Sequence, residues 1–174
     1  MPKQSPNRLP RWLKRKVPKG NANHFTAGVI SELGLATVCD HARCPNRMEC
    51  YAAKTATFMI LGETCTRGCG FCSVAKGKPK APAADEPARV ASAVERLGLR
   101  HVVITSVTRD DLADGGCEHF CRTISAIRRF DETVTIEVLP SDFGGNSESV
   151  SRLVSAVPDV YNHNVETVPR LYRD

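Results

Sequence analysis

Eight cysteines among 174 residues limit how this chain can fold more than any other feature. Six of them fall into two triplets, and each triplet can act as a unit only if its loop curves to bring the thiols together. The N-terminus lacks the apolar run of a secretory signal, so we expect a reducing compartment and no disulfide framework. Metal or redox chemistry is therefore the leading explanation of the cysteines.

The first triplet consists of Cys65, Cys69 and Cys72, with the spacing C-x3-C-x2-C. Glycines at positions 68 and 70 allow a short loop to curl around a bulky ligand. Three thiolates would hold three irons of a [4Fe–4S] cluster and leave the fourth iron open to an outside ligand. Catalytic metal sites need such an open position. A zinc knuckle that uses Cys69, Cys72 and cysteines elsewhere is the alternative.

The second triplet consists of Cys39, Cys44 and Cys50, with the spacing C-x4-C-x5-C, and it precedes the first along the chain. On its own it fits either a structural zinc site, with His41 as a further ligand, or a second iron–sulfur cluster. The presence of the first triplet favours the second cluster.

After residue 54 the chain alternates apolar, β-branched runs with amphipathic helical patterns. Such alternation predicts βαβ units and a parallel sheet with right-handed crossovers. Four strands do not close a barrel, so the pattern predicts an α/β fold with a parallel sheet that stays open. The predicted elements are strands at 55–62, 101–107, 133–139 and 159–162, a helix between an N-cap at Asp85 and Gly98, a helix with Cys117 and Cys121 on its buried face, and a helix at 147–156.

The net charge of +5 is unevenly distributed, because residues 1–20 hold seven basic and no acidic residues. We interpret 1–20 as a basic arm, either a solvated extension or a contact for nucleic acid or an acidic protein. Residues 21–54 would form a cysteine-organised loop with short helices, and residues 55–174 the domain of alternating strands and helices. No run approaches the roughly 20 apolar residues of a membrane span, so we expect a cytoplasmic protein.

The C-x3-C-x2-C triplet after an apolar strand resembles the signature of radical S-adenosylmethionine (SAM) enzymes, and the upstream C-x4-C-x5-C narrows the resemblance to lipoyl synthases. This family normally has a longer chain and six strands, so the resemblance implies a partial (βα) barrel of the TIM type that is cut short at Asp174, after about four strands. Other segments that resemble the family are Pro10-Arg-Trp-Leu13, Thr55-Ala-Thr-Phe-Met-Ile-Leu-Gly62, Val103-Ile-Thr-Ser-Val107, Arg109-Asp-Asp-Leu112, Asp114-Gly-Gly116, Ile136-Glu-Val-Leu139 and Asn162-His-Asn-Val-Glu-Thr-Val-Pro-Arg-Leu171.

The resemblance implies a sulfurtransferase with two [4Fe–4S] clusters and SAM. Cys65, Cys69 and Cys72 would bind the catalytic SAM cluster, and the upstream triplet would bind an auxiliary cluster that donates sulfur. The substrate would be an octanoyl-lysine of a lipoyl carrier protein, which gains sulfur at C6 and C8. A flavodoxin or ferredoxin would supply electrons, and we expect no membrane or nucleic-acid partner.

Ligands gather at the carboxyl ends of parallel strands, which makes four residues candidates for SAM contacts: Ser106, Glu137, Asn164 and Glu166. Each also has an ordinary alternative role, as a turn cap, a partner of loop backbone or a partner of an arginine. Two other functions stay open as well. The chain would then be another radical SAM enzyme of sulfur insertion or methylthiolation, or a non-enzymatic zinc or iron–sulfur protein.

Overall fold

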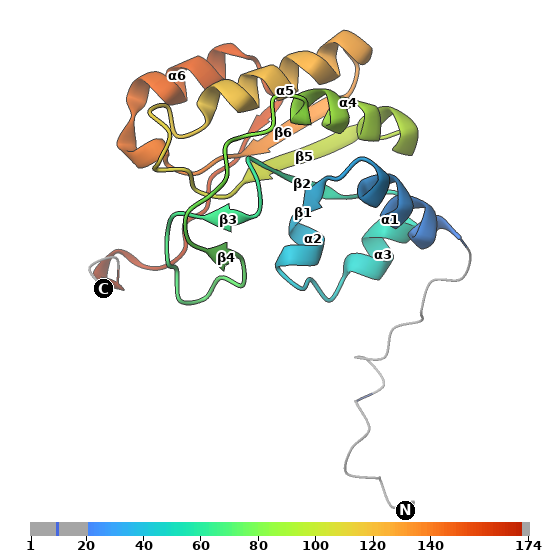
Figure 1. Ribbon diagram of the computed structural model, residues 1–174, viewed down its shortest axis with the longest axis horizontal. Coiled ribbons are helices and arrows are strands. Elements are labelled where there is room, and N and C mark those ends of the chain that lie inside the picture. Colours follow the sequence, from blue (N-terminus) through green and yellow to red (C-terminus); the bar gives the residue numbers. More distant parts are fainter. Residues whose placement is uncertain (1–9, 11–20, 172–174) are drawn as a thin grey trace, which may run out of the picture.

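The computed structural model describes residue 10 and residues 21–171, and it contains a five-stranded sheet in the order β1-β2-β5-β6-β7. Four of these strands are parallel neighbours: β2 (Thr57–Ile60), β5 (His101–Ser106), β6 (Thr135–Leu139) and β7 (Val160–Tyr161). The helices α4 (Glu86–Leu97), α5 (Cys117–Phe130) and α6 (Ser147–Ser155) cover one face of the sheet (Figure 1). The predicted α/β partial barrel and its strand–helix alternation are confirmed.

The core lies between this sheet and its helices, because apolar residues recur at spacings that suit each element. Ile104 and Val138 are buried at alternate positions of their strands, as expected of a pleated sheet. Val94 and Phe120 are buried on the facing helices at helical spacing from their apolar neighbours. Complete burial of a side chain of this kind stabilises the fold by roughly 1.5 to 3 kcal/mol.

The start of α4 differs from its prediction in one detail. Asp85 occupies the N-cap position, but its side chain makes no capping hydrogen bond. It pairs instead with Arg89, one turn along the helix, at 3.0 Å. Gly98 ends the helix in the left-handed conformation, as predicted.

The segment before β2 is more regular than its sequence indicates. It contains α1 (Ala22–Glu32), β1 (Ala36–Thr37), α2 (Val38–His41) and α3 (Arg47–Ala52). Strand β1 pairs antiparallel with β2 at the edge of the sheet, which the prediction of four parallel strands did not include. Two residues are too short a run to show strand periodicity, and the apolar residues of α1 do not follow a clear amphipathic pattern. The predicted short helices are α2 and α3.

The described residues stop short of both ends of the chain. Apart from Pro10, the basic arm at 1–20 lies outside the described residues, as do residues 172–174. After β7 the described chain ends in a single 3-10 turn, η3 (Pro169–Leu171). Within residues 21–171, no helix is both long and apolar enough to span a membrane.

Asp159 joins three elements at the start of β7, and its replacement by alanine should measure this junction. Its carboxylate accepts hydrogen bonds from the Ile136 N–H at 2.7 Å and from Arg128 at 2.5 Å, and these two contacts lower the pKa of Asp159. We expect Asp159→Ala to reduce the free energy of unfolding by about 1 kcal/mol near neutral pH, a figure that already allows for solvent screening of this exposed group.

The pH dependence of this loss follows from the lowered pKa. The carboxylate stabilises the fold above the ordinary aspartate pKa of about 3.9, and the contribution disappears as the pH falls through the lowered folded value. Urea unfolding of wild type and variant should therefore differ at neutral pH and converge in acid. A difference that stays constant into acid would contradict this assignment.

Candidate metal centre

The first cysteine triplet lies in the loop that follows β2, at the carboxyl end of the parallel sheet. Two short strands in this loop, β3 (Thr64–Cys65) and β4 (Ala75–Lys76), pair in parallel and close its base. Cys65 is half-buried in β3, whereas Cys69 and Cys72 are exposed at the tip. The Cys72 N–H donates to the Cys69 carbonyl at 3.2 Å, so the last two cysteines share one turn.

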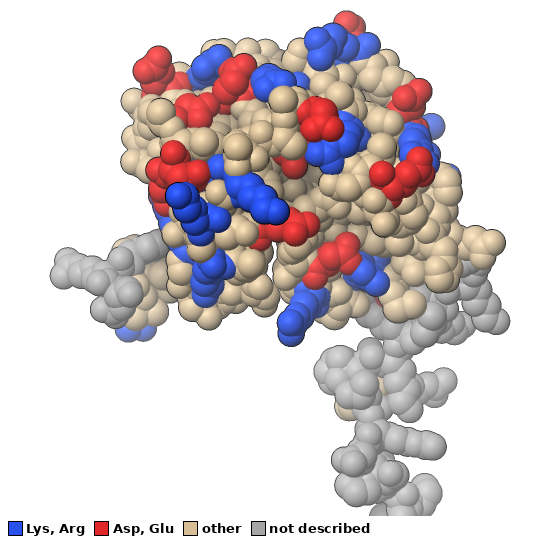
Figure 2. Space-filling view, in the orientation of Figure 1, with Lys and Arg blue, Asp and Glu red and all other residues tan. Residues whose placement is uncertain are grey.

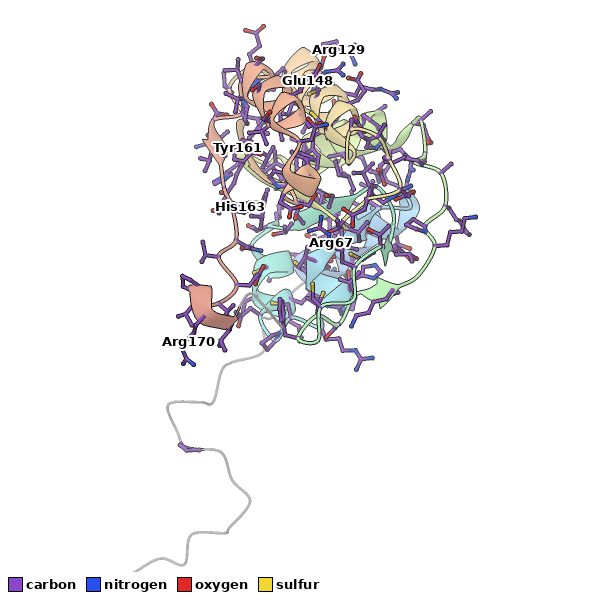
Figure 3. All side chains as sticks on the ribbon, turned by 90° about the vertical axis from the view of Figure 1, so that its left-hand side faces the viewer. Arg67, Arg129, Glu148, Tyr161, His163 and Arg170 are labelled. Carbon is purple, nitrogen blue, oxygen red and sulfur yellow. The ribbon has the colours of Figure 1, made fainter. Side chains whose placement is uncertain are left out.

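Arg67, between the first two cysteines, fastens this loop to the ends of β5 and β6. Its guanidinium donates to Asp110 at 2.7 and 2.9 Å and to Asp142 at 2.8 and 3.0 Å. These contacts raise the pKa of Arg67 and hold the pKa values of both carboxyls below their usual range. Figure 3 shows Arg67 at the same end of the sheet as His163, which lies just after β7. The loop is thereby held over the end of the sheet.

The second triplet is ordered by a polar network on α2 and α3. Asp40, next to Cys39, accepts hydrogen bonds from the Tyr51 hydroxyl at 2.7 Å and from Thr37 at 2.8 Å. Tyr51 is buried and adjoins Cys50, so the network links the first and last cysteines of the triplet. The Cys44 N–H donates to the Cys39 carbonyl at 3.1 Å.

The three thiols of the second triplet lie near one another. Cys39 is buried, and Cys44 and Cys50 are half-buried. Burial raises the pKa of the Cys39 thiol, and the neighbouring Cys50 and Cys44 raise it further. A thiol that is buried beside two others becomes a thiolate readily only when a metal compensates the charge.

The two triplets lie side by side, although they belong to different parts of the chain. His41, on α2, contacts Glu63, two residues before Cys65, at 3.3 Å. In Figure 1 the segment of α2 and α3 and the loop with β3 and β4 lie below the sheet, next to each other. Figure 2 shows a notch between these two lower parts, with red and blue side chains along its rim.

The four candidate SAM contacts are not brought together as one group. Ser106 ends β5 and has the same strand parity as the buried Val102 and Ile104. Glu137 has the opposite parity on β6, and it accepts from Asn162 at 3.1 Å and lies 3.1 Å from His101. The alternative in which Glu137 pairs with an arginine is therefore wrong, because its partners are Asn162 and His101. Asn164 and Glu166 lie exposed in the segment after β7.

Two local observations fit a bulky group at the carboxyl end of the sheet. An added Cβ at Gly68 or Gly70 would meet no atom within 4 Å, so packing within the protein does not explain these glycines. The Ser106 hydroxyl is buried and has no hydrogen-bond partner, which costs free energy unless a ligand satisfies it. Soft thiols suit iron or zinc.

The arrangement of the potential ligands is looser than a single-ion site. Among the residues that the structure describes, no three His, Cys, Asp or Glu side chains converge closely enough to hold one metal ion. The residues present that could hold an iron–sulfur cluster are the two cysteine triplets.

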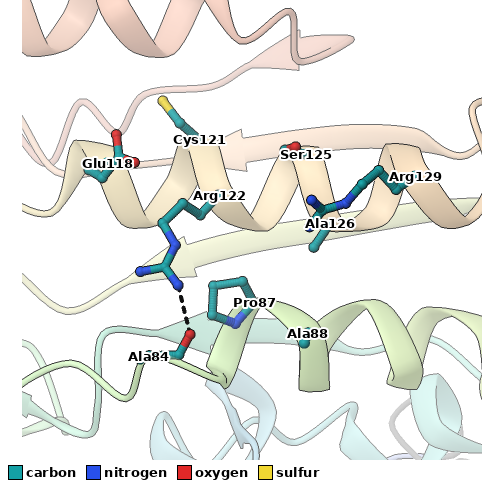
Figure 4. A pocket seen from close by; sticks show the side chains of 9 residues that line it. All are labelled: Ala84, Pro87, Ala88, Glu118, Cys121, Arg122, Ser125, Ala126 and Arg129. Carbon is teal, nitrogen blue, oxygen red and sulfur yellow. Dashed lines mark hydrogen bonds between the residues drawn. The ribbon is translucent and has the colours of Figure 1, made fainter.

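The two remaining cysteines belong to the helical layer. Cys117 is fully buried and donates to the Ser149 carbonyl at 3.0 Å, and burial raises its pKa to about 12. Cys121 is half-buried and lines a groove of about 510 Å³ between α4 and α5 (Figure 4). Arg122 crosses one end of this groove to donate to the Ala84 carbonyl at 2.8 Å. The prediction of core positions is confirmed for Cys117 and is only partly right for Cys121.

Several residues around the site escaped sequence reasoning. Glu86, in the first turn of α4, is buried and accepts a hydrogen bond from the Leu61 N–H at 2.8 Å. Arg109 is 1% exposed, and it donates to the Leu61 carbonyl at 2.8 Å. The charged run Arg109-Asp110-Asp111, which begins three residues after the end of β5, was the one available signal.

Comparisons with known proteins agree with these features. The family model of the radical SAM superfamily matches residues 59–174, and a model of the N-terminal domain of lipoyl synthase matches residues 1–44. A lipoyl synthase of Rhodopirellula baltica is 61% identical over 170 residues, which are 97% of this chain and 54% of that protein. A lipoyl synthase of Alkaliphilus metalliredigens is 50% identical over 95% of this chain and 57% of its own length.

This chain thus spans about half the length of the curated relatives that it matches. The superfamily match contains the whole first triplet and the parallel sheet from the second half of β2 onward, so it rests largely on the same residues as the geometry described above. The chain belongs to the radical SAM superfamily.

Proposed function

We propose that this chain is the N-terminal part of a lipoyl synthase, a radical SAM sulfurtransferase that inserts sulfur at C6 and C8 of a protein-bound octanoyl-lysine. The observation that carries the proposal is the adjacency of the two cysteine triplets, whose segments meet in the contact between His41 and Glu63. One triplet would serve radical generation and the other sulfur donation. The similarity to lipoyl synthases supports the same reading.

The first triplet would hold the SAM cluster through Cys65, Cys69 and Cys72. A bound [4Fe–4S] cluster supplies the electron that cleaves SAM into methionine and a 5′-deoxyadenosyl radical. The chain itself would fix the loop through Arg67 and orient SAM at the carboxyl ends of β5 and β6. Ser106 and Glu137 remain our candidates on these strands, and Asn164 and Glu166 our candidates after β7.

The second triplet would hold an auxiliary cluster through Cys39, Cys44 and Cys50. An unactivated C–H bond offers no group that an acid, base or nucleophile could use, so a radical must remove hydrogen before sulfur can bind. The network of Asp40, Thr37 and Tyr51 would keep the sulfur donor beside the first triplet. Each sulfur added would use one SAM molecule.

The proposal includes partners and a cellular location. The substrate would be an octanoylated lipoyl carrier protein or lipoyl domain, and the reductant a flavodoxin or ferredoxin. We place the reaction in the cytoplasm, without a membrane or nucleic-acid partner. The basic arm at 1–20, the auxiliary-cluster segment at 21–54 and the partial barrel at 55–174 would be its three parts.

Hydrogen transfer from a labelled substrate tests the function directly. The anaerobically reconstituted chain would be mixed with SAM, dithionite and an octanoyl-lysine peptide deuterated at C6 and C8. We expect 5′-deoxyadenosine that contains deuterium, and a peptide that gains sulfur. The matched control is the same peptide with deuterium only at C2, which should yield unlabelled 5′-deoxyadenosine.

Other outcomes identify the alternative functions. Unlabelled 5′-deoxyadenosine from the C6 and C8 peptide would indicate another radical SAM reaction, such as sulfur insertion or methylthiolation of a different substrate. Zinc without labile sulfide, and no cleavage of SAM, would indicate a non-enzymatic zinc protein. Labile sulfide without cleavage of SAM would indicate an iron–sulfur binding protein.

A further inference from the structure

Leu61, the first residue after β2, has an unusual backbone conformation. Its φ is +70°, and Gly62 follows with φ +92°. A positive φ is costly for a leucine, because its Cβ crowds the backbone, and it persists only where the surroundings hold it. The chain reaches Cys65 four residues later, so this turn aims the cysteine loop.

Two buried charged side chains hold the Leu61 peptide groups on either side of its Cα. Its N–H donates to Glu86 at 2.8 Å, and its carbonyl accepts from Arg109 at 2.8 Å. Glu86 is 8% exposed and Arg109 is 1% exposed. Neither side chain belongs to a strand, so these contacts replace the ladder hydrogen bonds that Leu61 lacks.

Glu86 and Arg109 each have a further side-chain partner that fixes their position. His119, on α5, lies 2.7 Å from the Glu86 carboxylate and is also buried. Asp111 accepts from two nitrogens of Arg109 at 2.8 Å, in a two-point contact that sets the orientation of the guanidinium. The position of the Leu61 peptide is therefore determined by α4, α5 and the loop after β5.

The loop after β5 also contacts the residues that follow Cys65. The Thr108 carbonyl accepts from the Thr66 N–H at 3.1 Å, and Asp110 accepts from Arg67. Residues 108–111 thus form hydrogen bonds with the chain before Cys65, at Leu61, and after it, at Thr66 and Arg67. Buried ion pairs often stabilise a fold no better than apolar residues of similar volume would.

We propose that Glu86 and Arg109 are positioning residues of the metal centre, which hold the Leu61 peptide so that Cys65 stands at the place a [4Fe–4S] cluster requires. The inference rests on the proposed function, because it assumes a cluster at the first triplet. The two side chains would act through the backbone and touch neither cluster nor SAM.

The test uses the full 174-residue chain with Cys39, Cys44 and Cys50 replaced by alanine, so that a single cluster site remains. In this background Glu86→Ala and Glu86→Gln are compared with Glu95→Gln, a matched change at an exposed glutamate of the same helix. Iron per chain, the electron paramagnetic resonance spectrum of the reduced cluster and its midpoint potential are measured after anaerobic reconstitution.

We expect Glu86→Ala to lower iron occupancy at least twofold and to change the spectrum of the iron that remains. Glu86→Gln should lose less iron, because an amide oxygen can still accept from the Leu61 N–H. It should still shift the spectrum and the potential, because the amide does not reproduce the contact of the carboxylate with His119 that fixes its position. Glu95→Gln should match the parent. A role in folding alone would lower the unfolding temperature without altering spectrum or potential.

The outcome for Glu86→Gln decides the proposal even if Glu86→Ala fails to fold. Occupancy, spectrum and potential equal to those of the parent would overturn the positioning role and leave the proposed function intact. A parent that binds no iron at the first triplet would overturn both.

Discussion

Alanine at Cys65, Cys69 and Cys72 will lower the iron content of the anaerobically reconstituted chain from about eight to about four atoms and will abolish reductive cleavage of SAM. The reason is that the three thiols lie on one loop at the carboxyl end of the parallel sheet, and a cluster that loses all its protein ligands cannot be retained. Iron and sulfide assays, with detection of 5′-deoxyadenosine, provide the measurement.

Two companion variants make this result specific. Replacement of Cys39, Cys44 and Cys50 by alanine should also remove about four irons, but SAM cleavage should persist, since the first cluster remains. Replacement of Cys117 and Cys121 should leave iron unchanged, because these thiols lie in the helical layer. Loss of all iron from the first variant, when the parent holds only about four, would contradict the prediction of two clusters.

The sequence was sufficient for those parts of the site that depend on neighbouring residues. Cysteine spacing is a local property, and so is the apolar run of β2 that precedes the first triplet. The same holds for α4, whose end at Gly98 follows from backbone preference alone. These features could be predicted because they require no knowledge of which distant segments meet.

Contacts between distant segments were beyond sequence reasoning. Arg67 and Asp142 are 75 positions apart, and nothing in either local pattern indicates that they pair. The contact of His41 with Glu63 depends on how α2 packs beside the loop after β2, which the short β1 makes possible by pairing with β2. Nothing in the sequence around Glu86, the first residue of α4, indicates that its side chain is buried.

For the candidate SAM contacts, the sequence predicted the position along the strand but not the face of the sheet. Position at the end of a strand was enough to select Ser106 and Glu137, but the face on which each lies depends on sheet register. The register pairs Val103 with Glu137, so Glu137 lies on the face opposite to that of Ile104 and Ser106. The unpartnered hydroxyl of Ser106 keeps it as a candidate.

Gly116→Ala will destabilise the fold more than most single substitutions, by about 3 kcal/mol. Gly116 has φ +92°, and a Cβ at this position would stand 2.3 Å from Cδ1 of the buried Leu61. The Leu61 side chain has little room to turn away, because it is buried and because Glu86 and Arg109 hold the backbone that carries it. Urea unfolding of the metal-free chain measures the loss.

Gly98→Ala is the control that separates crowding from backbone strain. Gly98 also has a positive φ, of +63°, but a Cβ there would meet nothing within 4 Å, so the expected loss is only about 1 kcal/mol. The difference between the two variants then measures how rigidly Leu61 is held. Because Leu61 aims the cysteine loop, Gly116→Ala should also lower iron retention, whereas Gly98→Ala should not. Equal losses of stability in the two variants would mean that the buried Leu61 side chain yields freely to the added methyl group.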